Sequence, residues 1–94
     1  MSNILELLKK LGLDDNIHST DDVDTIGEKF LNNAKANKEK LKEMVLLLTI
    51  DEKKEAKFLV SKIEERINQM SRVKRGIVLH MYGDTLDELE KALS

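Results

Sequence analysis

The chain has 94 residues, of which 40% are hydrophobic, 36% are charged and 3% are aromatic, and its formal net charge is −2. This length fits a single domain spanning residues 1–94, and the absence of cysteine excludes disulfide bonds, thiolate catalysis and thiolate metal sites. No proline and only four glycines are present, which favours an all-α fold over a turn-rich β fold.

The first predicted helix begins near the N-terminus and is short. Asn3 is a suitable N-cap, and Glu6 stands at the position that completes a capping box. Gly12 fits the left-handed residue that ends a helix, with Leu13 placed to fold back on it. A helix of this length is marginal alone, so we expect it to pack on the rest of the chain.

The second predicted helix covers residues 21–48. Ser19 or Thr20 is expected to cap it, and the aspartates that follow favour the positive end of its dipole. Asparagines lower helix propensity in its middle, so we predict one helix that is bent or split near Ala36. Gly27 would permit the close approach of a neighbouring helix.

The third predicted helix begins at Thr49, which forms a capping box with Glu52. Apolar residues then recur at alternating four- and three-residue steps, with only Lys74 interrupting, a spacing that makes a narrow seam along one helix face. The seam consists of Ala56, Val60, Ile63, Ile67, Met70 and Ile77. Because the corner at residues 48–50 is short, we expect the second and third helices to form an antiparallel hairpin.

Residues 77–82 are compatible with either a buried strand or the end of the third helix. A lone strand would leave its backbone groups unpaired, so we predict a helix that ends at Gly83. Thr85 and Glu88 form another capping box, which predicts a short last helix. The sequence thus predicts a bundle of about four helices, built on a long hairpin with short terminal helices packed across it.

Charge is distributed unevenly along the chain, with net charges of −3 for residues 1–37, +4 for 38–83 and −3 for 84–94. Either the acidic ends pack over the basic middle, or the middle presents a basic surface to an anionic partner. Interleaved glutamates and the lack of aromatic platforms favour a solvated helix face, with nucleic-acid binding as the second choice. The candidate phosphate contacts are Lys62, Arg66, Arg72 and Arg75.

A cluster of apolar residues near the end of the third helix is the best candidate contact surface. Either the last helix covers it, or it is exposed to another protein subunit or to a second copy in a homodimer. The candidate partner-binding residues are Ile77, Leu79, Met81 and Tyr82.

No motif for catalysis, a metal or a cofactor is evident, so we expect a protein that is not an enzyme and has none of these groups. His18 and His80 lack ligand partners at suitable spacing, and the glycines form no phosphate-binding cluster. The longest apolar run, residues 44–48, is far too short for a membrane span, and no secretion signal is evident. A cytoplasmic protein is the expectation.

The segment Leu-Thr-Ile-Asp-Glu-Lys-Lys-Glu-Ala-Lys-Phe-Leu at residues 48–59, followed by Ile-Glu-Glu-Arg at 63–66, resembles the helical domain of archaeal GINS replication subunits. In size and composition the chain is also similar to small accessory subunits of crenarchaeal replicative polymerase assemblies. The resemblance covers about a quarter of the chain, which lacks the small β domain that GINS subunits often carry. It implies a non-catalytic scaffold in a DNA-processing complex and assigns no contact residue.

Overall fold

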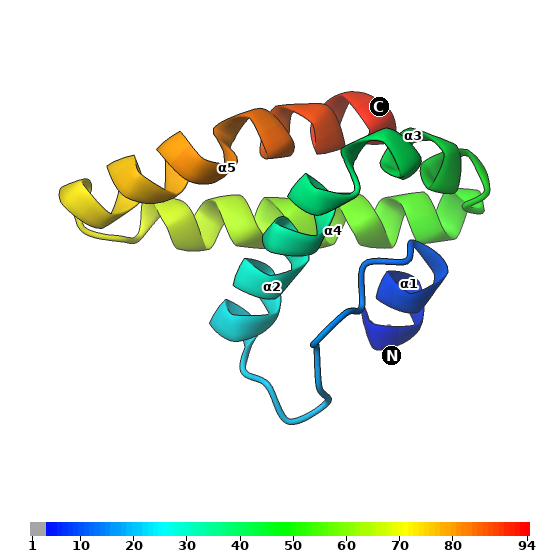
Figure 1. The fold of residues 1–94 in the computed structure, drawn as a ribbon, viewed down its shortest axis with the longest axis horizontal. Helices are drawn as coiled ribbons and strands as arrows, with labels where there is room; N and C mark the ends of the chain where they lie inside the picture. Colours follow the sequence, from blue (N-terminus) through cyan, green and yellow to red (C-terminus); the bar gives the residue numbers. More distant parts are fainter. Residues whose placement is uncertain (1–3) are drawn as a thin grey trace.

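The computed structural model describes residues 4–94, and within this range the fold is all-α, as the sequence predicts. Residues 4–94 form five helices rather than the predicted four or so. Their bounds are α1 Ile4–Lys10, α2 Val23–Ala36, α3 Lys38–Leu46, α4 Ile50–Asn68 and α5 Arg72–Leu93. The two longest, α4 and α5, pack against each other as an antiparallel hairpin, and α2 crosses beneath them (Figure 1).

Helix α4 begins at the predicted capping box. The Glu52 amide donates to Thr49 Oγ1 at 3.1 Å, and the Thr49 amide donates to Glu52 Oε1 at 2.9 Å. Four residues of the predicted apolar seam, Ala56, Val60, Ile63 and Ile67, are buried along α4. The other two lie outside α4: Met70 is in the turn that follows it, and Ile77 is in α5 and 57% exposed. This seam anchors the core because α1, α2 and α5 all pack on α4.

The predicted end of the third helix at Gly83 is wrong. Helix α4 ends at Asn68, and α5 begins after Ser71, whose Oγ accepts from the Lys74 amide at 3.4 Å. Gly83 and Thr85 lie inside α5, so the predicted short last helix does not exist as a separate element. A straight rod would have left the apolar side of residues 82–93 in water, whereas the turn at 69–71 folds that side onto the core.

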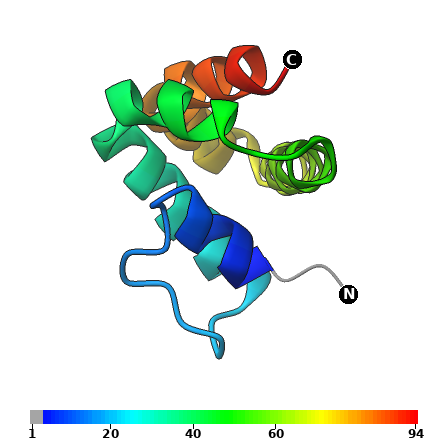
Figure 2. The same cartoon turned by 90° about the vertical axis from the view of Figure 1, so that its right-hand side faces the viewer.

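The predicted hairpin therefore has a different second arm, because α5 rather than residues 21–48 runs antiparallel to α4. Residues 77–82 are helical, as predicted. Figure 2 views α4 end-on and shows α1 and α5 approaching it from different sides.

Residues 21–48 split into α2 and α3 at Asn37, next to the predicted position. The cap of α2 is Asp22, whose side chain accepts from the Thr25 amide at 2.8 Å, and not Ser19 or Thr20. Gly27 is buried against α4, and a Cβ there would lie 3.4 Å from Ile63 Cγ1, so it does allow the close approach.

The N-terminal helix ends as predicted. Gly12 has φ +70°, its amide donates to the Lys9 carbonyl at 3.0 Å, and the Leu13 amide donates to the Leu8 carbonyl at 2.8 Å. This is the hydrogen-bond pattern of a Schellman motif, and it buries Leu13 completely. The proposed Asn3 cap lies outside the described residues. The short α1 packs on α4.

Candidate protein-interaction groove

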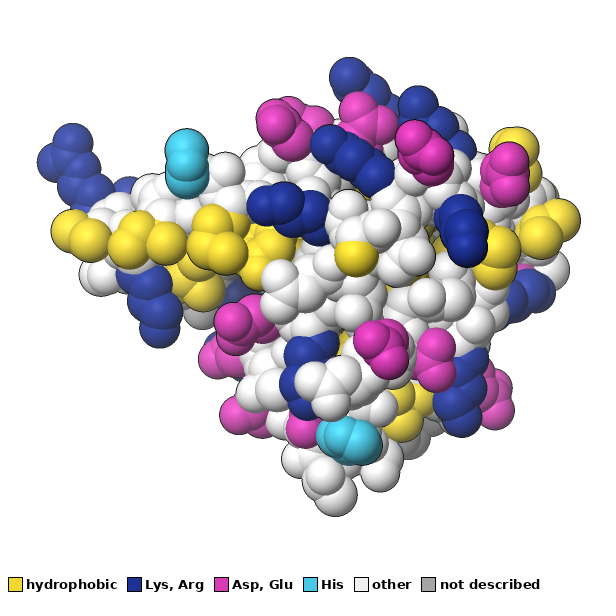
Figure 3. Space-filling view, in the orientation of Figure 1, with side chains coloured by type: hydrophobic (Ala, Val, Ile, Leu, Met, Phe, Trp, Pro, Cys, Tyr) yellow, Lys and Arg dark blue, Asp and Glu magenta, His cyan; other side chains and the backbone are white. Residues whose placement is uncertain are grey.

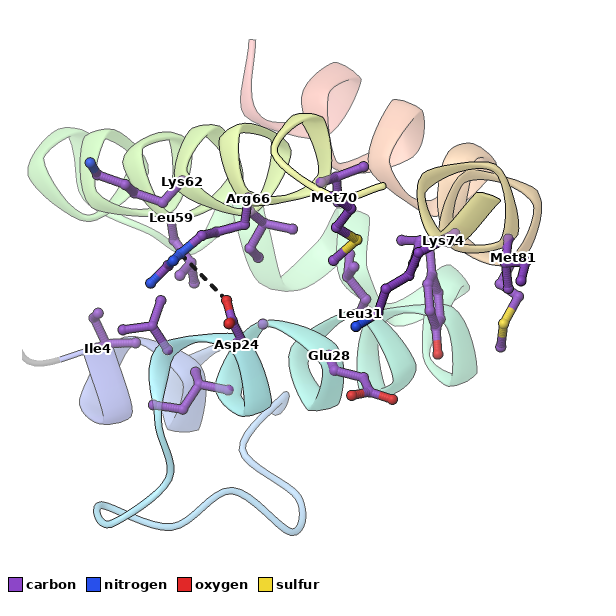
Figure 4. Close-up of a pocket in the computed structure, with 18 residues that line it drawn as sticks. Ile4, Asp24, Glu28, Leu31, Leu59, Lys62, Arg66, Met70, Lys74 and Met81 are labelled. Atoms are coloured by element: carbon purple, nitrogen blue, oxygen red, sulfur yellow. Dashed lines mark ion pairs between the residues drawn. The ribbon is translucent and has the colours of Figure 1, made fainter. Parts of the chain in front are cut away.

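An apolar groove of about 350 Å³ lies between α2, α4 and α5. Its inner surface is formed by Ile63 and Ile67 of α4, Leu31 of α2, and Val78 and Tyr82 of α5. Figure 4 shows the α2 side and the α4 side facing each other across it. We refer to it as the α2/α4/α5 groove.

Tyr82, which lines the groove, makes contacts that join α2 to α5. The Tyr82 hydroxyl donates to the Asn32 side chain, and Lys35 Nζ lies 5.6 Å from the centre of the Tyr82 ring. Lys35 Nζ also donates to the carbonyl of Met81 at 3.0 Å. These contacts join the second half of α2 to α5, whereas the first half of α2 packs on α4 at Gly27. Residues of both attachments, Gly27 and Tyr82, line the groove. Burial, followed by the charge of Glu28, raises the pKa of Tyr82.

The rims of the groove carry charges of opposite sign. Asp24 and Glu28 lie on the α2 side, and Lys62, Arg66 and Lys74 lie on the α4 and α5 side (Figure 4). One pair bridges the groove, because Arg66 Nε is 3.4 Å from Asp24 Oδ1. The inner surface is thus apolar, and the charged groups stand at its edge.

The first half of α5 presents an exposed apolar ridge beside the groove. Val73, Ile77 and Met81 recur every fourth residue and are 75%, 57% and 45% exposed. A four-residue step places them on one helix face. Figure 3 shows a band of hydrophobic side chains along this arm of the molecule. Ile77 and Met81 also line the groove, so the ridge and the groove form one continuous surface.

The four predicted partner-binding residues are separated by the structure. Ile77 and Met81 lie on the ridge, whereas Leu79 is exposed but does not line the groove. Tyr82 is 5% exposed and forms part of the inner surface. The sequence did not indicate the α2 wall or Val73, although the spacing of residues 73, 77 and 81 was a usable signal.

The four predicted phosphate-binding residues divide between two helices. Lys62 Nζ lies 3.6 Å from Glu65 and 5.4 Å from the centre of the Phe58 ring, and Arg66 pairs with Asp24.

The other two stand at the start of α5. Arg72 is exposed, and Arg75 donates to the Asn68 carbonyl at 3.4 Å. Two basic residues of the middle segment, residues 38–83, do pair with acids of the terminal segments. Arg66 pairs with Asp24, and Lys42 Nζ lies 3.8 Å from Glu88 Oε2.

A group of carboxylates lies between α4 and α5. Burial, followed by hydrogen bonding to and repulsion from Glu90 and by the charge of Asp87, raises the pKa of Glu64 from 4.5 to about 6.

Elsewhere hydrogen bonds favour ionised carboxylates. The pKa of Glu52 is lowered chiefly by its hydrogen bond with Lys10, and that of Asp21 chiefly by its hydrogen bond with Lys29.

His18 and His80 are both exposed, and among residues 4–94 no three histidine or acidic side chains are placed to hold a metal ion. Over the same range, no helix has the length and hydropathy that crossing a membrane requires. No family model matches the chain, and no curated protein or solved structure is significantly similar to it.

Proposed function

We propose that this protein is a non-catalytic interaction domain, an accessory subunit that receives a helix of another protein chain in the α2/α4/α5 groove. The observation that carries the proposal is the continuity between the apolar groove and the exposed α5 ridge. Contiguous exposed apolar surface edged by polar groups is typical of interaction sites. Amphipathic helices bind grooves of this kind through residues spaced three or four apart.

The distribution of charge supports an interaction role. The polar groups of the groove stand at its rim, and two of them, Asp24 and Arg66, are joined in an ion pair. Charged rims around an apolar centre resemble the layout of protein–protein interfaces. The resemblance to GINS subunits extends the proposal to a partner within a DNA-processing assembly in the cytoplasm.

Affinity capture with matched variants tests the groove. The bait is the full chain, compared with Ile77→Asp on the ridge and with Leu47→Asp at the corner between α3 and α4. Both native residues are large, apolar and well exposed, at 57% and 69%, so both variants should fold. A partner that binds the wild type and Leu47→Asp but not Ile77→Asp supports the proposal. A partner retained by Ile77→Asp refutes the assignment of the groove.

Titration with single-stranded and duplex DNA at two salt concentrations tests the alternative function. Binding that weakens as salt rises, and weakens further in Lys62→Glu/Arg66→Glu, would favour nucleic-acid recognition over the proposed role.

A further inference from the structure

The two rims of the groove carry charges of opposite sign, and one acid and one base among them form no ion pair within residues 4–94. Glu28 on α2 and Lys74 on α5 stand on opposite sides of the opening (Figure 4). Within residues 4–94 neither is part of an ion pair, whereas Asp24 and Arg66 nearby are joined. An occupant of the groove therefore meets a negative charge on one side and a positive charge on the other.

This surface is complementary to itself under a two-fold rotation. When two copies meet face to face about an axis that runs along the groove, the acidic rim of each copy faces the basic rim of the other. Glu28 of one copy then approaches Lys74 of the second, and the same contact occurs a second time by symmetry. An axis across the groove would instead place like charges together, which charge repulsion disfavours.

The groove, together with the part of the α5 ridge that lines it, gives such a pair its apolar centre. Val73 and Ile77 are more than half exposed in a single copy, and the groove next to them is open. In the face-to-face arrangement the two grooves meet, and Ile77 and Met81, which belong to both the ridge and the groove, are covered by the other copy. Both apolar surfaces are then removed from water in one contact, a favourable change.

We propose that the partner held by the groove is a second copy of this chain, in a two-fold dimer fixed by reciprocal Glu28–Lys74 ion pairs on either side of the two facing grooves. This inference rests on the proposed function, since it names the occupant of the same groove. It makes the dimer sensitive to salt, because its specificity depends on ion pairs at the rim.

Charge reversal and mixing provide the test, with sedimentation equilibrium from about 1 µM to about 1 mM chain as the measurement. The wild type, with a chain mass of 10.8 kDa, should associate to twice that mass. Lys74→Glu alone and Glu28→Lys alone should each raise the dimer Kd at least about tenfold, because each places like charges together at two positions. Lys54→Glu and Glu39→Lys, at exposed positions that do not line the groove, are the matched controls and should dimerise like the wild type.

An equimolar mixture of Lys74→Glu with Glu28→Lys should recover dimerisation, because every rim contact between the two chains is again between opposite charges. The double variant Lys74→Glu/Glu28→Lys should recover it as well. A wild type that stays monomeric throughout the range overturns the inference, and so does a mixture no more associated than its components.

Failure of the dimer is distinguishable from failure of the proposed function. If the wild type is monomeric but captures a different protein that Ile77→Asp loses, the second-copy inference falls and the interaction role stands. If Ile77→Asp changes neither dimerisation nor capture, both fall.

Discussion

Replacing Gly83 with alanine tests the course of α5 directly. The sequence predicts that a helix ends at Gly83, and a terminating glycine with positive φ would disfavour alanine. The structure instead places Gly83 inside α5, where a Cβ would have no atom within 4 Å. The two descriptions predict changes of opposite sign in the free energy of unfolding.

The expected magnitude follows from helix propensity. Glycine in a helix interior is less favourable than alanine by about 1 kcal/mol, and here no steric clash offsets that gain. Gly83→Ala should therefore raise the free energy of unfolding by about 1 kcal/mol. For a domain of this size the midpoint temperature should rise by about 4–8 °C.

Gly12→Ala is the matched control. Its site is also open, with nothing within 4 Å of an added Cβ, but its φ is +70°. A left-handed backbone conformation costs an alanine about 1–2 kcal/mol, so this variant should lose stability. Urea unfolding followed by far-ultraviolet circular dichroism measures both, with the slope of the transition checked for constancy. A loss of stability in Gly83→Ala comparable to that in Gly12→Ala would refute a continuous α5.

Two further predictions concern local electrostatics and capping. The raised pKa of Glu64 means that its ionisation opposes folding, so stability should fall as pH rises from 4.5 through about 6 and stay reduced above. The shift corresponds to about 2 kcal/mol without screening, and to about 1 kcal/mol or less for this partly exposed carboxyl. Glu64→Gln should therefore raise the free energy of unfolding by about 1 kcal/mol or less at neutral pH and leave it unchanged near pH 4. Equal effects at the two pH values would contradict the assignment. Thr49→Ala should cost about 1 kcal/mol in urea unfolding, because it removes the cap of α4. Ser71→Ala should lower the free energy of unfolding by less, since the hydrogen bond from the Lys74 amide to Ser71 is longer, at 3.4 Å. The reverse order of the two losses would contradict this ranking of the caps.

Several elements of this fold could be read from local sequence. The Schellman ending at Gly12 and Leu13 and the capping box at Thr49 depend on neighbouring residues only, and both form as predicted. The all-α class follows in the same way from composition and from the seam of α4. For the groove, the sequence indicated Ile77 and Met81 as contact residues but gave no sign of the α2 wall that faces them.

The same kind of local signal failed at Thr85. The capping-box pattern is present, yet Thr85 is 2% exposed inside α5, where the chain continues as a helix through Gly83. The turn at residues 69–71 has no glycine or proline to announce it, and only Ser71 offers a weak cap signal.

Local sequence thus determined the all-α class, the end of α1 and the start of α4. Tertiary packing decided where the long helical stretch folds back, because only the turn after Asn68 buries Tyr82, Leu86 and Leu89 in the core. A cap contributes about 1 kcal/mol, whereas each large apolar side chain contributes about 1.5–3 kcal/mol on burial, so the packing of several such residues outweighs a local capping signal. The groove between α2, α4 and α5 exists because the chain folds back after Asn68 and places α5 beside α4.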